Sequence, residues 1–112
     1  IEAKSSTDAE NFIGYFPRAV TDRGQRHLQE LILALNYGYR AAIVFIVQRT
    51  DATRFRPNDR VDPGFGQVLR EAALQGVETY AWTSRFDEMK YEITLKTRIP
   101  VDLSRVASAE ES

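Results

Sequence analysis

Residues 41–47 constrain the fold more than any other part of this chain. They read Ala-Ala-Ile-Val-Phe-Ile-Val, a continuous apolar run rich in β-branched side chains. Strands that are buried on both faces have this composition, and they usually lie in the middle of an α/β sheet. Residues 1–4 alternate apolar and polar, which predicts a half-buried strand that carries Glu2 and Lys4 on one face.

Two helices are expected around this central strand. Thr21 is a good N-cap for the first, which should end near Gly38, and its apolar stripe recurs at helical spacing: Leu28, Leu31, Ile32 and Leu35. Asp62 followed by Pro63 is a typical start for the second helix, and Gly76 is a typical end. Strand, helix and strand in this order predict an α/β layer.

The remaining segments give weaker signals. Residues 77–82 are expected to form a further strand, and residues 91–95 and 99–103 a small edge hairpin. Residues 5–19 and 48–60 are polar and carry glycine or proline, so we expect loops there. The length of 112 residues suits one domain, over residues 1–103, followed by a flexible acidic tail at 104–112.

Composition excludes several classes of function. The chain contains no cysteine, which rules out disulfides, thiolate metal sites and cysteine nucleophiles. Its apolar runs are much shorter than the ~20 residues of a membrane helix. We therefore expect a soluble, cytoplasmic protein with no membrane partner.

The net charge of −1 conceals an uneven distribution. Residues 11–60 carry a charge of +4, whereas the rest of the chain carries −5. All the basic residues of this middle segment are arginines: Arg18, Arg23, Arg26, Arg40, Arg49, Arg54, Arg56 and Arg60. Arginine binds phosphate groups in bidentate fashion, so the segment is compatible with nucleic-acid binding, although a solvated surface with a modest charge bias is the more common explanation.

The short sequence Glu2-Ala3-Lys4 is a candidate for chemistry. The two-residue period of a strand places the carboxylate and the ammonium side by side. A carboxylate can hold a hard divalent cation, and a lysine can orient water and offset charge on a phosphate, so the pair suits phosphodiester hydrolysis. Exposed strands also pair opposite charges for structural reasons, and spacing alone does not separate the two interpretations.

Polar residues on the first helix and at the end of the buried strand are further candidates. Arg23 and His27, the only histidine, fall along one polar stripe of the helix. Thr21 is foremost a cap, and Gln48 ends the central strand, where ligands often bind in α/β sheets. A solvated helix face and a polar strand end are the structural alternatives.

Residues 16–28 make the sequence similar to a known family. They read Phe-Pro-Arg-Ala-Val-Thr-Asp-Arg-Gly-Gln-Arg-His-Leu, followed by Glu30-Leu31, and this segment resembles the hallmark of the sugar fermentation stimulation protein family (SfsA). The Glu-Ala-Lys-Ser of residues 2–5 is similar to that family's Glu-Val-Lys-Ser strand. The resemblance extends to about residue 103, through residues in the family order: Gln48, Arg49, Asp51, Phe55, Pro57, Asp62, Pro63, Gly76 and Val77.

The resemblance implies a mixed sheet flanked by helices, similar to the restriction-endonuclease-like PD-(D/E)xK fold. It also implies a nuclease that cleaves DNA or RNA with Mg²⁺ or Mn²⁺. Glu2 would be a metal ligand and Lys4 the catalytic lysine. Further residues would bind nucleic acid or support the site, namely Thr21, Arg23, His27, Gln48 and Arg49.

The family's longer architecture suggests that this chain is a C-terminal fragment. Family members carry an OB-like domain and a first acidic metal ligand upstream of the Glu-x-Lys strand, so we expect the fragment alone to be nearly inactive. Arg18 stands where the family usually has aspartate. The alternative hypothesis is a non-enzymatic DNA-binding or regulatory protein linked to sugar metabolism, and homo-oligomerisation is left open.

Overall fold

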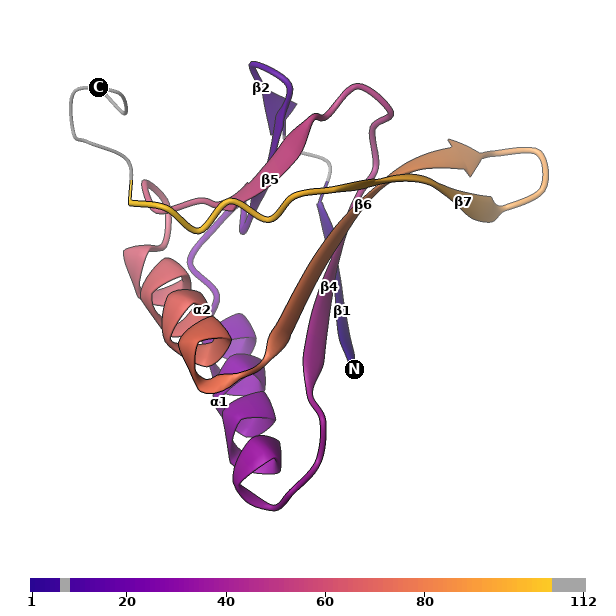
Figure 1. The fold of residues 1–112 in the computed structure, drawn as a ribbon. Helices are drawn as coiled ribbons and strands as arrows, with labels where there is room; N and C mark the ends of the chain where they lie inside the picture. Colours follow the sequence, from indigo (N-terminus) through magenta and orange to yellow (C-terminus); the bar gives the residue numbers. More distant parts are fainter. Residues whose placement is uncertain (7–8, 106–112) are drawn as a thin grey trace.

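The computed structural model of this chain describes residues 1–6 and 9–105, and two helices lie on one face of its main sheet (Figure 1). The main sheet has the strand order β1-β4-β6-β7, formed by β1 (Glu2–Ser6), β4 (Ala42–Val47), β6 (Glu78–Asp87) and β7 (Glu92–Ile99). The first three strands run parallel, and β7 runs antiparallel to β6. The sheet is therefore mixed, with the predicted buried strand β4 at its centre.

A second, smaller sheet covers part of the same face. It contains β2 (Ala9–Glu10), β3 (Ile13–Phe16) and β5 (Arg54–Pro57) in that order. The prediction of loops over residues 5–19 and 48–60 was thus wrong in part. β3 and β5 are only four residues long and mix glycine, arginine and proline with aromatic residues, so neither shows a sustained strand pattern.

The C-terminal strand also differs from the prediction. β7 is one continuous strand that pairs with β6 over most of its length, so the predicted hairpin of residues 91–95 with 99–103 does not form. Val101 instead forms a parallel bridge with Phe55 of the second sheet. Of the predicted tail, residues 106–112 lie outside the described residues, whereas Ser104 accepts a hydrogen bond from Arg56 through its backbone oxygen at 2.7 Å.

Both helices begin at the predicted caps, α2 ends at the predicted Gly76, and α1 ends at Asn36, two residues before Gly38. α1 (Asp22–Asn36) follows the N-cap Thr21, whose Oγ1 accepts a hydrogen bond from the backbone N–H of Gly24 at 2.9 Å. α2 (Pro63–Gln75) ends at Gly76, which adopts φ of 115°, a left-handed conformation that glycine tolerates best. No helix within the described ranges is long and apolar enough to cross a membrane.

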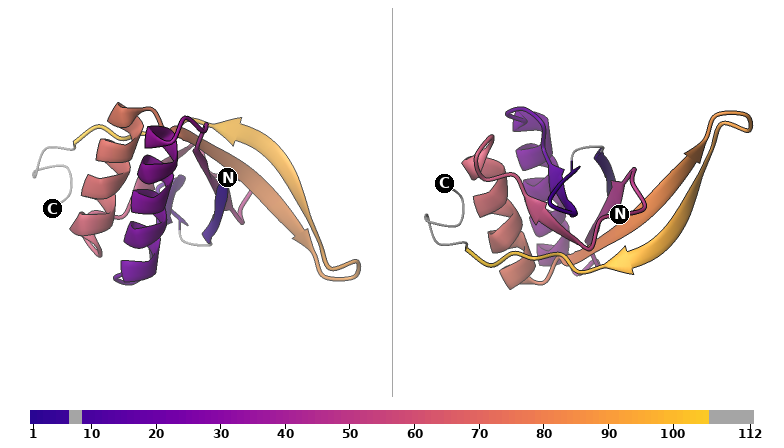
Figure 2. Two further views of the ribbon diagram at one scale, coloured as in Figure 1. Left: turned by 90° about the horizontal axis from the view of Figure 1, so that it is seen from below. Right: turned by 90° about the horizontal axis from the view of Figure 1, so that it is seen from above.

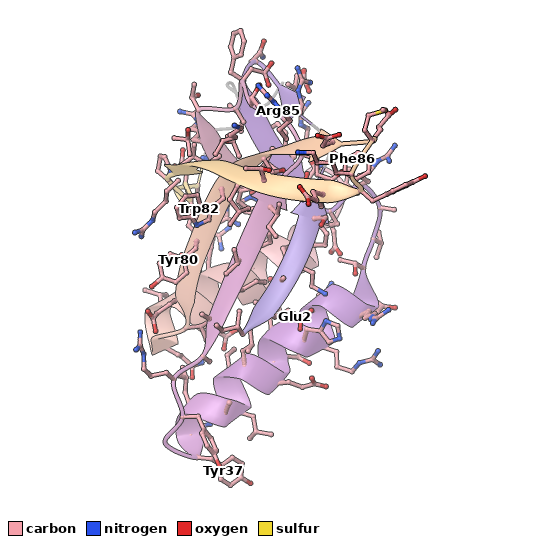
Figure 3. All side chains as sticks on the ribbon, turned by 90° about the vertical axis from the view of Figure 1, so that its right-hand side faces the viewer. Glu2, Tyr37, Tyr80, Trp82, Arg85 and Phe86 are labelled. Atoms are coloured by element: carbon pink, nitrogen blue, oxygen red, sulfur yellow. The ribbon has the colours of Figure 1, made fainter. Side chains whose placement is uncertain are left out.

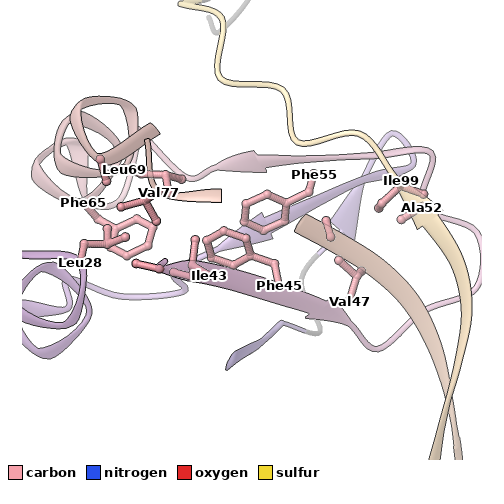
Figure 4. Close-up of a cluster of buried hydrophobic side chains, with 13 residues drawn as sticks. Leu28, Ile43, Phe45, Val47, Ala52, Phe55, Phe65, Leu69, Val77 and Ile99 are labelled. Carbon is pink, nitrogen blue, oxygen red and sulfur yellow. The ribbon is translucent and has the colours of Figure 1, made fainter. Parts of the chain in front are cut away.

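Phenylalanine side chains join the main sheet to the layers above it (Figure 4). The rings of Phe45 on β4 and Phe55 on β5 stack with centroids 4.0 Å apart. Phe65 on α2 meets Phe45 edge-on at 6.4 Å. Phe45, Phe55 and Phe65 are fully buried, so their contacts form the centre of the hydrophobic core.

The buried carboxylate of Asp62 connects the starts of both helices. It accepts hydrogen bonds from the backbone N–H of Phe65 in α2 at 3.0 Å and from the backbone N–H of Thr21 at 2.8 Å. The side chain of Gln25 in α1 donates a third at 3.1 Å. Burial opposes ionisation of Asp62, but these hydrogen bonds outweigh it and hold the pKa below its ordinary value of 3.8.

Replacing Asp62 should therefore destabilise the whole fold. We expect Asp62→Ala to lower the free energy of unfolding by about 2–4 kcal/mol, because three donors lose a charged acceptor in a buried place. The stabilisation that the wild-type carboxylate gives to the fold should be complete above pH ~4. It should be lost as the pH falls through the lowered folded-state pKa. Urea unfolding between about pH 2 and 7 measures both effects.

Two variants serve as controls for that measurement. The free energy of unfolding of Asp62→Asn should not show the fall at low pH that Asp62 causes in the wild type, since an amide does not titrate. Asp51→Asn breaks only an exposed pair with Arg49 and should cost less than about 1 kcal/mol. Equal losses in Asp62→Ala and Asp51→Asn would contradict the assigned role.

Candidate active site

Glu2, Lys4 and His27 form a compact polar cluster at the edge of the main sheet. The Nζ atom of Lys4 lies 3.1 Å from Oε1 of Glu2 and 2.7 Å from Nδ1 of His27. The same Nδ1 atom lies 3.1 Å from Oε1 of Glu2. The structure thus brings together the strand pair and the helix residue that the sequence marked separately.

The register of β1 explains why these side chains meet. Glu2 lies opposite Ile43 and Lys4 opposite Phe45 in the parallel pair of β1 and β4. Ile43 and Phe45 are fully buried beneath the helices, so Glu2 and Lys4 share the helix-covered face of the sheet. Because β1 is the edge strand in the described part of the chain, both polar heads still reach solvent beside α1, where Figure 3 shows Glu2.

Glycine at position 24 allows the first turn of α1 to lie close to α2. A Cβ atom there would stand 2.9 Å from Cγ2 of Thr21 and 3.1 Å from Cε1 of Phe65, which is too close for an ordinary contact. This approach and the Asp62 hydrogen bonds position α1 against the edge of the sheet, and His27 follows one turn further on. The site thus depends on contacts made on the other side of the helix.

The charges of the cluster follow from its hydrogen bonds. Partial burial of Glu2 opposes ionisation, but the hydrogen bond and positive charge of Lys4 outweigh it, with a further contribution from His27. The pKa of Glu2 consequently lies below its ordinary value of 4.5, and the carboxylate is anionic at neutral pH. The side chain of Lys4 is only 13% exposed, so these two acceptors define its position.

The other predicted site residues do not join this cluster. Thr21 caps α1, and its backbone N–H is bound by Asp62. Gln48 lies beyond the far end of β1, where its backbone N–H donates to the carbonyl of Ser6 at 2.7 Å. Arg49 forms an ion pair with Asp51 at 2.7 Å, whereas Arg23 is exposed on α1, one turn before His27.

The arginine-rich middle segment is largely neutralised by acidic residues from other parts of the chain. Arg56 is buried and lies 2.8 Å from the carboxylate of Asp102, so it is not available to a phosphate. Asp102 also lies within ion-pair distance of Arg54, and Glu78 and Glu10 lie within that distance of Arg40 and Arg60. Arg49 pairs with Asp51 inside the segment. Among the described residues, Arg23 and Arg26 of α1 have no such partner, which leaves the start of α1 as the basic surface near the cluster.

Known proteins resemble this chain over most of its length. A family profile described as "Sugar fermentation stimulation protein RE domain" matches residues 1–90. The sugar fermentation stimulation protein homologue of Caldanaerobacter subterraneus subsp. tengcongensis is 48% identical over 103 residues, which are 92% of this chain and 44% of that protein. The homologue of Citrifermentans bemidjiense is 43% identical over 101 residues, which are 90% of this chain and 43% of the relative.

A solved structure is similar as well. "The structure of Pyrococcus Furiosus SfsA in complex with Ca2+" matches with a TM-score of 0.82 and 34% identity, over 90% of this chain and 43% of that one. This match confirms the predicted α/β fold with a restriction-endonuclease-like mixed sheet. The chain spans less than half the length of these relatives.

The cluster geometry makes a prediction about His27. A lysine ammonium has donors only, so the 2.7 Å contact of Nδ1 with Lys4 requires an unprotonated Nδ1, whereas donation to Glu2 at 3.1 Å requires a proton there. The shorter contact with Lys4 favours the neutral ring that carries its proton on Nε2. We expect ¹⁵N NMR at about pH 8 to show the Nε2–H tautomer as the major form. Lys4→Met removes the donor and should weaken this preference, whereas a ring protonated on Nδ1 in the wild type would show that Nδ1 donates to Glu2 rather than accepting from Lys4.

Proposed function

Because this chain belongs to the sugar fermentation stimulation protein family, we propose that it forms the lysine and carboxylate part of a metal-dependent nuclease site that cleaves DNA or RNA. The cluster of Glu2, Lys4 and His27 is the observation that carries this proposal. The family profile describes an RE domain, which supports the same chemistry. The proposal assigns the remaining groups of the site to the part of the relatives that this chain does not span.

Lys4 is the residue best placed to act on the reacting groups. Its ammonium donates to Glu2 and to Nδ1 of His27, which leaves one of its three donors for a water molecule or a phosphate oxygen. A positive charge held in this way stabilises the negative charge that develops on a phosphate during hydrolysis. His27 acts through Lys4 and is a positioning residue.

Glu2 fits the role of a ligand for Mg²⁺ or Mn²⁺. Its carboxylate is anionic and the side chain is 30% exposed, so a cation can reach it. No group of three or more histidine, aspartate or glutamate side chains that could hold a metal lies within residues 1–6 and 9–105. Mg²⁺ often takes one or two carboxylates and fills its other positions with water and substrate phosphate, so Glu2 could serve as one of its ligands.

A bound cation would supply Lewis acidity toward water and a phosphate oxygen. The structure of the Pyrococcus furiosus relative is described as a complex with Ca²⁺, another hard cation that prefers oxygen ligands. That description supports a cation site in the family, and the donor chemistry of Glu2 supports its place in this chain.

Arg23 and Arg26 are proposed to bind the nucleic-acid backbone next to the cluster. Both are exposed on the first turns of α1, and the described residues offer neither of them a carboxylate. Arg23 precedes His27 by one helical turn, so its guanidinium projects along the same face. A phosphate adjacent to the scissile one could therefore contact Arg23 while Lys4 faces the reacting group.

Manganese binding tests the metal site without reference to activity. Addition of Mn²⁺ to this chain should broaden the NMR signals of Glu2, Lys4 and His27 before others, because paramagnetic relaxation falls steeply with distance. Glu2→Gln should abolish this selective broadening, since it removes the anionic ligand. The matched control Glu71→Gln, on the exposed side of α2, should leave it unchanged, and broadening centred elsewhere would contradict the assignment.

Cleavage of labelled DNA and RNA tests the reaction itself. In a protein that joins this chain to the region of a full-length relative that it does not span, Glu2→Gln and Lys4→Met should each lower the Mn²⁺-dependent cleavage rate by about 100-fold or more. Glu71→Gln should cleave at the wild-type rate, and circular dichroism should show that all three variants keep the fold. Full activity in either site variant would refute the mechanism.

The same substrates distinguish the alternative, a non-enzymatic nucleic-acid-binding domain. Binding that needs no metal, weakens steeply with salt and leaves both strands intact would favour that function. Glu2→Gln would then have little effect, whereas Arg23→Glu and Arg26→Glu would weaken binding.

A further inference from the structure

The free edge of β7 is an exposed surface that the proposed nuclease site does not use. The hairpin of β6 and β7 projects away from the body of the molecule (Figure 2). β7 is the last strand of the main sheet, with β6 as its one neighbour among the described residues. Every residue from Glu92 to Arg98 is exposed, so this edge is open to another strand.

Two charged side chains of this edge have no ion-pair partner within the described residues. Glu92 and Lys96 take part in no ion pair there. Glu92 also lies opposite Asp87 in the pair of β6 and β7, which places two carboxylates side by side. A cation beside Glu92 would therefore relieve a like-charge contact.

The sequence of β7 complements itself in the antiparallel direction. With a two-fold axis at Thr94, Glu92 lies opposite Lys96 of the second copy, and Ile93 lies opposite Leu95 of the second copy. Each contact occurs twice because the axis relates the two strands. Both charges and both apolar residues gain suitable partners in this one register.

The apolar face of the hairpin agrees with this arrangement. Ile93 lies opposite Phe86 in the hairpin, and Leu95 shares their face by strand alternation. Phe86 is 49% exposed, and Ile93 and Leu95 are each 47% exposed. Pairing of two β7 strands would join these side chains into one apolar strip across both copies, while Glu92 and Lys96 would pair on the opposite face.

We propose that β7 mediates homodimerisation of this chain by antiparallel pairing about Thr94, which extends the main sheet across two copies. The regular part of β7 in the β6–β7 pairing runs from Glu92 to Leu95, and Lys96 is the first residue of the irregularity that lies between Leu95 and Arg98. A register centred on Leu95 would use Arg98 instead, but that guanidinium lies over the ring of Tyr80 at 4.8 Å. Nucleic acid is a less suitable occupant of this edge, since the hairpin carries four basic and four acidic residues: Arg85, Lys90, Lys96, Arg98, Glu78, Asp87, Glu88 and Glu92.

Charge reversal tests the pairing in the full chain. Sedimentation of the wild type up to about 1 mM should show a concentration-dependent dimer. Glu92→Lys alone and Lys96→Glu alone should each raise the dissociation constant about tenfold, because each places like charges together twice. The double variant Glu92→Lys/Lys96→Glu should restore wild-type dimerisation, and Glu88→Lys, the same charge change in the adjoining turn, should leave it unchanged.

A cysteine crosslink tests the register directly. The chain has no cysteine, so Thr94→Cys introduces a single thiol. Residues opposite each other across an antiparallel pair have Cα atoms ~4.5–5.5 Å apart, which suits a disulfide. Thr94→Cys should therefore oxidise to a covalent dimer much faster than Ser104→Cys, which lies outside the pairing. A monomer at all concentrations, a double variant as weak as the single ones, or equal crosslinking of both cysteine variants would each overturn the proposal.

Discussion

The carboxylate of Asp62 is the interaction on which the rest of the structure depends. It caps α2 by accepting a hydrogen bond from the backbone N–H of Phe65. It also accepts hydrogen bonds from the backbone N–H of Thr21 and from the side chain of Gln25, both at the start of α1. Two helix starts therefore share one acceptor. This fixes how far α1 lies from α2, and through α2 and its Phe65 it fixes α1 against the sheet. In this arrangement Nδ1 of His27 on α1 lies 2.7 Å from Nζ of Lys4 on β1.

Much of the fold was predictable because it comes from strong local signals. The apolar run of β4, the caps of α1 at Thr21 and of α2 at Asp62, and the stop at Gly76 all predicted the observed elements. The short strands β3 and β5 gave no such signal, since their order depends on long-range contacts such as the stacking of Phe55 on Phe45. The continuous β7 was missed for a similar reason: its residues are exposed, and pairing with β6 rather than burial holds them in place.

The candidate site was predictable in its members but not in its geometry. Strand periodicity placed Glu2 and Lys4 together, and helix periodicity placed His27 on a polar stripe, yet neither period relates the strand to the helix. For the arginine-rich segment, the charge counted along the sequence did not give the charge of the folded surface. Charge counted along the sequence suggested a broad basic surface, whereas folding places Asp102 beside Arg56 and Glu78 beside Arg40. What remains is a small basic region around Arg23 and Arg26.

The register of β1 against β4 has a consequence for how the cluster could be lost. Side chains alternate between the two faces of a strand, so a shift of β1 by a single residue would turn Ala3 and Ser5 toward the helices and carry Glu2 and Lys4 to the opposite face. A strand side chain points to one face of the sheet or to the other, so no intermediate register keeps the cluster in part. Substitutions of Ile43 or Phe45, which carry no polar group, could therefore erase the site as completely as removal of Lys4.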